Sequence, residues 1–137
     1  MNRIFNKIGF SSCLALALAL PLGASAANPV QDGYRAAAKQ ENPVFKDFSA
    51  EAGQKLYSTK VGDLACASCH TDSPKAAGKH VKTNKEILPL APSANPRRFS
   101  DATNVEKWFK RNCNDVLKRA CTAQEKGDFM AYVLSVK

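Results

Sequence analysis

The chain has 137 residues, of which 20 are Lys or Arg and 12 are Asp or Glu, and it contains five cysteines. This length predicts one domain. The long apolar run near the N-terminus is not followed by a second one, so the sequence does not predict a membrane-embedded protein.

Residues 1–26 have the pattern of a secretory signal peptide. Arg3 and Lys7 form a positive n-region, residues 8–22 are apolar, and residues 24–26 (Ala-Ser-Ala) form a small-residue cleavage site. We expect cleavage after Ala26, which leaves residues 27–137 as one domain in the periplasm. Two positive charges are removed, so the net charge falls from +8 to +6. Export makes nucleic acid an improbable partner, and the basic charge favours a membrane surface or an acidic protein.

Two helices are expected before the first cysteine of the mature chain. Residues 30–40 form an Ala-rich segment that must end before Pro43. Ser49 has the side chain of an N-cap residue and predicts a second helix over residues 50–57. This second helix contains a Gly-x-x-Leu-Tyr pattern that starts at Gly53.

The sequence Cys66-Ala67-Ser68-Cys69-His70 is C-x-x-C-H, the pattern of c-type haem attachment. Two thiols at this spacing add to the two vinyl groups of one porphyrin and form two thioethers. The next residue is then close enough to ligate the iron, and His is the common proximal ligand. The motif predicts one covalent haem c attached through Cys66 and Cys69, with His70 as the proximal ligand.

Two other interpretations of the cysteines are weaker. A structural zinc site is built from paired knuckles of closely spaced cysteines, whereas seven residues separate Cys113 from Cys121. A thioredoxin-like redox pair lies in a βαβ context, and no strand pattern precedes Cys66.

Residues 71–101 are predicted to be a loop-rich segment. It contains three helix-breaking prolines and a group of spaced lysines. The lysines form either a solvated surface or a docking surface for an acidic partner. They are Lys75, Lys79, Lys82 and Lys85.

Thr103 to Glu106 has the pattern of a capping box and predicts a helix. One side of that helix carries Val105, Trp108, Phe109 and Asn112.

After haem attachment, Cys113 and Cys121 remain as an even pair. A disulfide is the default for such a pair in an oxidising compartment. Closing a loop of about nine residues stabilises a protein by roughly 2.6 kcal/mol in the chain-entropy model.

A second capping box, Thr122 to Glu125, predicts a terminal helix to about Ser135. Its apolar side carries Phe129, Tyr132, Val133 and Val136. The expected fold is therefore all-α, and its order of elements resembles that of a small class I cytochrome c, over most of the mature chain. In that family the N-terminal Gly-x-x-Leu-Tyr helix crosses the C-terminal aromatic helix, which predicts Gly53 against Phe129 and Tyr132.

Three side chains are candidates for the second axial ligand. Met130 lies inside the terminal helix, which favours a core position. His80 is only ten residues after His70, so its loop would have to cross from one haem side to the other. Asn112 is a polar residue on an apolar helix side. It is either a ligand or a core Asn bonded to the backbone.

The C-terminal part of the chain, residues 85–137, resembles the sphaeroides haem protein family. The matching segments are Lys85-Glu86-Ile87, Pro89-Leu90-Ala91-Pro92-Ser93-Ala94, Arg98-Phe99, Val105-Glu106-Lys107-Trp108, Arg111-Asn112-Cys113-Asn114, Cys121-Thr122 and Glu125-Lys126. Members are small monohaem c-type cytochromes that bind oxygen. The resemblance implies that Asn112 is the distal ligand and that Cys113 and Cys121 form the adjacent disulfide. It also implies that the asparagine leaves the iron on reduction, so that oxygen or nitric oxide binds.

The sequence thus predicts a periplasmic cytochrome that binds oxygen, nitric oxide or carbon monoxide at ferrous haem. The resemblance implies a dihaem cytochrome c as its electron donor. Another redox protein, including one at the membrane, is the alternative partner. One alternative is a plain six-coordinate electron carrier with His80 or Met130 as ligand. Another is an oxygen or nitric oxide reductase. No catalytic acid or base stands out, so the sequence favours an electron-transfer and ligand-binding protein over an enzyme.

Overall fold

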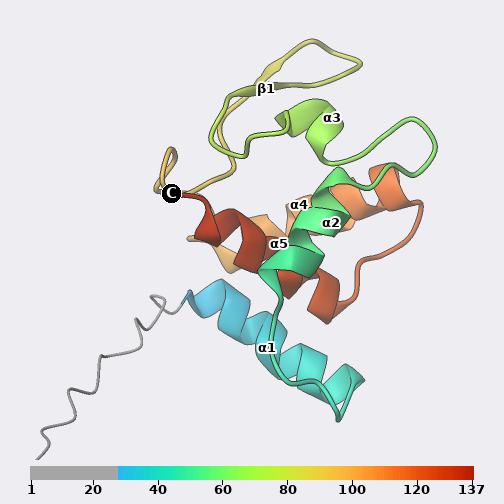
Figure 1. The fold of residues 1–137 in the computed structure, drawn as a ribbon, viewed down its shortest axis with the longest axis vertical. Coiled ribbons are helices and arrows are strands. Elements are labelled where there is room, and N and C mark those ends of the chain that lie inside the picture. Colours follow the sequence, from blue (N-terminus) through green and yellow to red (C-terminus); the bar gives the residue numbers. More distant parts are fainter. Residues whose placement is uncertain (1–27) are drawn as a thin grey trace, which may run out of the picture.

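The computed structural model describes residues 28–137, and the predicted signal peptide lies outside them. Figure 1 shows helices that pack around one another, with a small hairpin above them. In chain order the elements are α1 (Pro29–Glu41), α2 (Ala50–Ser58), α3 (Ala67–His70), β1 (Gly78–Lys79), β2 (Glu86–Ile87), α4 (Ala102–Leu117) and α5 (Ala123–Ser135). Within the described part of the chain, no helix is long and apolar enough to cross a bilayer.

Side-chain caps open three of the helices, and two of these caps, at Ser49 and Thr122, were predicted. The Asn28 side chain accepts hydrogen bonds at the start of α1, and Ser49 accepts one from the Ala52 amide at the start of α2. At the start of α5, Thr122 and Glu125 form the predicted capping box. Each cap satisfies amide groups that the first helical turn leaves without partners.

The start of α4 corrects one prediction. Asp101, not Thr103, is the N-cap residue, and its side chain accepts a hydrogen bond from the Asn104 amide. An aspartate at this position also suits the positive end of the helix dipole. The helix ends at Lys118, which adopts a left-handed conformation with φ of 60°.

The hairpin formed by β1 and β2 was not predicted. Its strands are antiparallel and only two residues long, with Gly78 opposite Ile87 and Lys79 opposite Glu86. Two-residue strands are too short to show an alternating pattern. The His80 side chain stabilises the turn, because its Nδ1 atom accepts hydrogen bonds from the amides of Lys82 and Thr83 at 3.3 and 3.2 Å.

The contact between α2 and α5 is the predicted crossing of the N-terminal and C-terminal helices. A Cβ atom on Gly53 would lie 1.9 Å from the Asp128 carbonyl oxygen and 2.9 Å from Tyr132 Cβ. The helices therefore touch through the backbone, and only glycine fits at this position. Phe129 lies beside this contact and packs against Tyr57, with 6.1 Å between the ring centroids.

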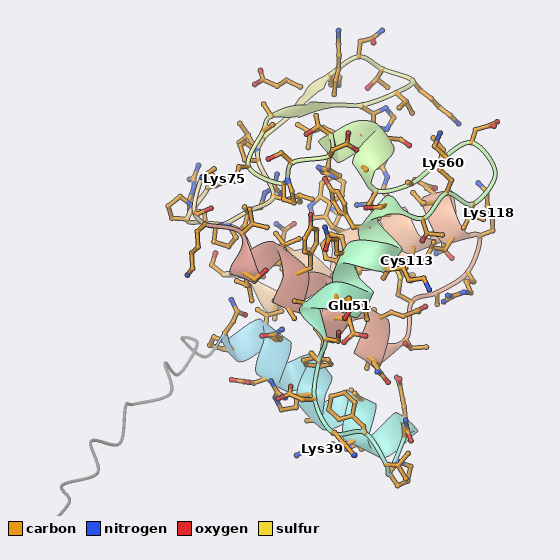
Figure 2. All side chains as sticks on the ribbon, in the orientation of Figure 1. Lys39, Glu51, Lys60, Lys75, Cys113 and Lys118 are labelled. Carbon is orange, nitrogen blue, oxygen red and sulfur yellow. A yellow bond between two sulfur atoms is a disulfide. The ribbon has the colours of Figure 1, made fainter. Side chains whose placement is uncertain are left out.

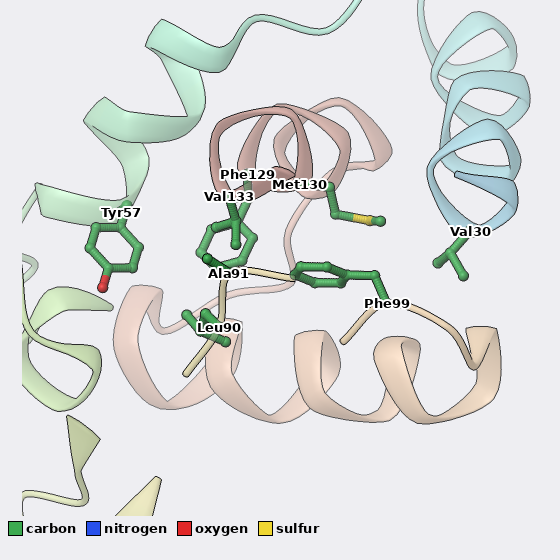
Figure 3. Close-up of a cluster of buried hydrophobic side chains, with 8 residues drawn as sticks. All are labelled: Val30, Tyr57, Leu90, Ala91, Phe99, Phe129, Met130 and Val133. Carbon is green, nitrogen blue, oxygen red and sulfur yellow. The ribbon is translucent and has the colours of Figure 1, made fainter. Parts of the chain in front are cut away.

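The main core lies between α2, α4, α5 and the segment that precedes α4. Figure 3 shows Leu90 and Ala91 between α4 and α5, and Phe99 below Met130. Met130 has no exposed surface and is a core residue. The core also packs against Cys66, Val105 and Phe109, so it connects the haem motif to α4.

Candidate functional site

The C-x-x-C-H motif forms a single helical turn. Cys66 precedes α3, Cys69 lies within it, and His70 ends it. Both cysteines are free thiols and half-buried. The Tyr57 hydroxyl lies 3.1 Å from the His70 carbonyl oxygen and 2.5 Å from that of Thr71, with both oxygens as acceptors. The buried tyrosine of the Gly-x-x-Leu-Tyr pattern therefore fixes the end of the motif to α2.

The hairpin supports the same turn from the other side. A Cβ atom on Gly78 would lie 2.0 Å from the Cys69 carbonyl oxygen and 3.0 Å from His70 Cα. Strand β1 thus lies directly against the backbone of the motif. Gly78 is a residue of the site that the sequence did not indicate, because the hairpin itself was not predicted.

The motif has the protonation states that a haem ligand set needs. Burial, with a smaller effect of the Arg98 charge, lowers the pKa of His70 to about 4. The imidazole is therefore neutral near pH 7, which is the form that binds a metal. Burial raises the pKa of Cys66 to about 11. A redox pair of the thioredoxin type has a lowered cysteine pKa instead, so that interpretation does not fit.

Cys113 and Cys121 are joined by a disulfide, with 5.7 Å between the Cα atoms. This is the pairing expected from the sequence, and it removes two of the four thiolates that a zinc site would need. No cluster of His, Cys, Asp or Glu suited to a metal ion is found among residues 28–137. The bridge connects Cys113, one turn before the end of α4, to the residue before the Thr122 cap of α5.

The short connection between α4 and α5 is also held by an ion pair. Both outer nitrogens of Arg119 donate to the Glu125 carboxylate, at 2.7 and 2.6 Å. The same carboxylate accepts a hydrogen bond from the Thr122 amide at 2.9 Å. The C-terminal end of α4 is therefore fixed to α5 by a covalent bond and a bidentate ion pair.

We expect the double variant Cys113→Ser, Cys121→Ser to lose about 2–3 kcal/mol of stability, because the disulfide closes a short loop of the unfolded chain. Urea unfolding of the oxidised wild type and the variant measures the difference. Two free thiols in the non-reduced wild type, found by alkylation and mass spectrometry, would contradict the prediction.

The side chains of α4 divide into a packed side and an open side. Glu106 and Phe109 face α1 and α5. The Tyr34 hydroxyl donates to Glu106 at 2.8 Å, and the Phe109 ring lies 5.5 Å from that of Phe129. Trp108 lies on the other flank and is 45% exposed. Asn112 is exposed on the same flank, because residues four apart lie one above the other on a helix.

The predicted apolar side of α4 is therefore only partly correct. Val105 and Phe109 pack on the core, whereas Asn112 is not buried. Within residues 28–137 the Asn112 carboxamide makes no hydrogen bond that caps the backbone. Asn114, two residues further along, does so by donating to the Lys110 carbonyl oxygen at 2.7 Å. A role for Asn112 as a buried backbone cap is thus wrong.

The side chains of the other two ligand candidates have structural roles elsewhere in the fold. His80 holds the hairpin turn through Nδ1, and Met130 is buried in the core. Both positions have a sufficient structural explanation.

The motif and several apolar or charged side chains of the chain suit a covalently attached haem. Two free thiols and a neutral imidazole are the groups that would attach a haem and provide one ligand to its iron. Leu88 and Trp108 are large apolar side chains that are 57% and 45% exposed, and they suit the apolar faces of a porphyrin. Arg98 is a half-buried cation near His70 and suits the propionate groups. The donor set and its surroundings therefore fit this cofactor.

Comparisons with known proteins agree with this fit. A family model described as "Domain of unknown function (DUF1924)" matches residues 43–133. The cytochrome c-type protein SHP of Cereibacter sphaeroides is 42% identical over 127 residues, which cover 88% of this chain and 93% of the relative. Cytochrome c'' of Methylophilus methylotrophus is 40% identical over 107 residues, 74% of each chain.

Solved structures of the same two relatives share the fold. The structure of "oxidized SHP, an oxygen binding cytochrome c" has a TM-score of 0.67 at 41% identity and covers 76% of this chain and 91% of that one. The solution structure of cytochrome c'', described as giving insight into "haem-ligand detachment", has a TM-score of 0.68 at 39% identity and covers 77% of this chain and 90% of that one. The chain therefore belongs to the family of small c-type cytochromes that includes the sphaeroides haem protein and cytochrome c''.

Proposed function

We propose that the chain is a periplasmic monohaem cytochrome with a displaceable distal ligand, and that it binds oxygen, nitric oxide or carbon monoxide in its reduced state. A haem held in this way supplies one-electron transfer and, with an open axial position, a binding site for small ligands. Cys66 and Cys69 would attach it, and the neutral imidazole of His70 would provide the proximal nitrogen. The two solved relatives, one described as an oxygen-binding cytochrome c and the other studied for the detachment of a haem ligand, support this function.

Asn112 is the residue that we assign as the displaceable ligand. The observation that carries this assignment is its placement: the amide is exposed on the open flank of α4, and no backbone group within the described chain uses it. The adjacent Cys113–Cys121 bridge limits how far the backbone at Asn112 moves. An amide oxygen is a neutral and weak donor that prefers ferric to ferrous iron, so reduction favours its release. Because the bridge restrains the backbone, this release would be a small local motion.

The substitution Asn112→Ala tests the assignment. We expect the ferric absorption spectrum to change to that of a water-bound or five-coordinate haem, while carbon monoxide binding to the reduced protein persists. Asn114→Ala is a matched control, because Asn114 is also an exposed asparagine of α4 but lies on the opposite side of the helix. Its ferric spectrum should equal that of the wild type. A wild-type ferric spectrum in Asn112→Ala would contradict the assignment.

The two alternative functions give different results in the wild type. A plain six-coordinate electron carrier does not take up carbon monoxide when reduced, whereas the proposed function requires uptake. A reductase would consume oxygen or nitric oxide continuously with an electron donor, and the proposed function expects no such steady turnover.

We further propose that a dihaem cytochrome c or another acidic redox protein docks at the hairpin. Residues 75–85 contain four lysines and no acidic residue, and all four lysines are exposed. The turn that carries them is held by the His80 hydrogen bonds. Exposed charges of this kind accelerate encounter with an oppositely charged partner and are screened by salt.

We expect Lys79→Glu, Lys82→Glu to slow electron transfer from reduced flavodoxin, an acidic one-electron donor, about tenfold or more at low ionic strength. Lys39→Glu, Lys46→Glu carries the same change of charge. Figure 2 shows Lys39 at the opposite end of the molecule from the hairpin, so this control should slow the reaction much less. Stopped-flow rates at several ionic strengths measure the difference. Equal rates for the two double variants would exclude docking at the hairpin.

A further inference from the structure

The sequence motifs leave Arg98 without a role, yet its surroundings are unusual for an arginine. The side chain is half-buried, and the ion pairs found within residues 28–137 do not include it. Its Nε atom donates to the Pro89 carbonyl oxygen at 2.8 Å, and Nη2 donates to that of Leu88 at 2.7 Å. A partly desolvated cation is costly unless an anion or several acceptors compensate it. Two neutral carbonyls satisfy only part of the guanidinium, which has five N–H donors.

The backbone around Arg98 holds the guanidinium close to the haem motif. The segment that it binds continues to Leu90 and Ala91, whose amides both donate to the Pro74 carbonyl oxygen at 2.9 Å. Pro74 is only four residues after His70. Leu90 also belongs to the core against which Cys66 and Ala67 pack, so the segment that binds Arg98 lies beside the haem motif.

The residue after Arg98 is held in a sparsely populated conformation. Phe99 is buried and has a φ of 58°, in the left-handed region that is unfavourable for a residue with a side chain. The Asn28 side chain donates to its carbonyl oxygen at 3.2 Å. The direction of Arg98 is thus determined by packing on both sides and is not that of a free surface side chain.

We propose that Arg98 is an electrostatic positioning residue, which raises the reduction potential of the haem through its fixed positive charge and its attraction for an anionic propionate. This inference rests on the proposed function, because it concerns the haem held by His70. Ferric haem carries one more positive charge than ferrous haem, so a nearby cation destabilises the ferric state more. Neutralising a propionate acts in the same direction. Arg98 therefore favours the reduced state, in which the distal ligand is released.

Redox titration of the holoprotein tests the proposal with variants that separate charge from hydrogen bonding. Arg98→Gln removes the charge, and we expect its ferrous-to-ferric ratio at a given potential to fall about tenfold. Arg98→Lys keeps the charge but loses the paired hydrogen bonds to Leu88 and Pro89. We expect its potential to stay near that of the wild type while its thermal stability decreases. Arg97→Gln removes the same charge from an exposed neighbour and should change the ratio much less.

Two results would overturn the proposal. One is a shift in Arg98→Gln no larger than that in Arg97→Gln. The other is a fall in Arg98→Lys as large as that in Arg98→Gln, which would assign the effect to hydrogen bonding. Should Arg98→Gln fail to bind haem, Arg98→Met, which keeps a long aliphatic stem without charge, takes its place in the same comparison. The carbon monoxide and Asn112→Ala spectra test the proposed function separately, since neither depends on the potential of the Arg98 variants.

Discussion

Gly53→Ala is expected to destabilise the protein by at least about 3 kcal/mol, a large part of the stability of a domain of this size. The added Cβ atom would meet the Asp128 carbonyl oxygen at 1.9 Å and Tyr132 Cβ at 2.9 Å. The first of these belongs to the backbone of α5, so no rotation of a side chain relieves the overlap. The two helices must move apart, and the Tyr57 contacts at the end of the haem motif then weaken as well.

Chemical denaturation of the holoprotein measures this effect, and Gly33→Ala is the matched control. Gly33 lies in the middle of α1, and a Cβ atom there has no neighbour within 4 Å. Because alanine is a better helix former than glycine, this control should be neutral or up to about 1 kcal/mol more stable. A Gly53→Ala protein as stable as Gly33→Ala would show that the helices do not cross at this glycine.

Gly78→Ala is expected to change the haem site itself. Its Cβ atom would lie 2.0 Å from the Cys69 carbonyl oxygen and 3.0 Å from His70 Cα. Relief requires a shift of the hairpin or of the turn that carries His70, because both groups are backbone. We expect a loss of about 1–3 kcal/mol, as for other overpacked positions, together with an altered ferric absorption spectrum.

The spectrum distinguishes this local effect from a general loss of stability. In Gly33→Ala, which adds the same methyl group to an open position, the ferric spectrum should be that of the wild type. If Gly78→Ala also has a wild-type spectrum and wild-type stability, the hairpin does not lie against the backbone of Cys69 and His70.

Several features of this protein were determined by sequence signals that act over a few residues. The Ser49 cap and the Thr122–Glu125 capping box predict helix starts correctly, because a cap satisfies amides only two or three residues away. The C-x-x-C-H motif is equally local, since its spacing alone brings two thiols and an imidazole to one helical turn. The order of the predicted helices around this motif likewise predicts the all-α cytochrome fold, which the solved relatives share.

The remaining features depend on contacts between distant segments. Asp101 and Thr103 lie close together and both suit an N-cap, and in the folded protein it is the Asp101 side chain that accepts a hydrogen bond from the Asn104 amide. The hairpin, with Gly78 against Cys69, pairs segments too short to show a periodic pattern.

Helical periodicity placed Asn112 on the apolar side of α4, but α1 and α5 cover only the Phe109 flank and leave Asn112 open. Arg98 likewise became part of the site only through carbonyls nine and ten residues away. The sequence by itself determines local hydrogen bonds and the spacing of side chains along a helix. Which side of that helix becomes buried is decided only by the segments that pack against it in the tertiary structure.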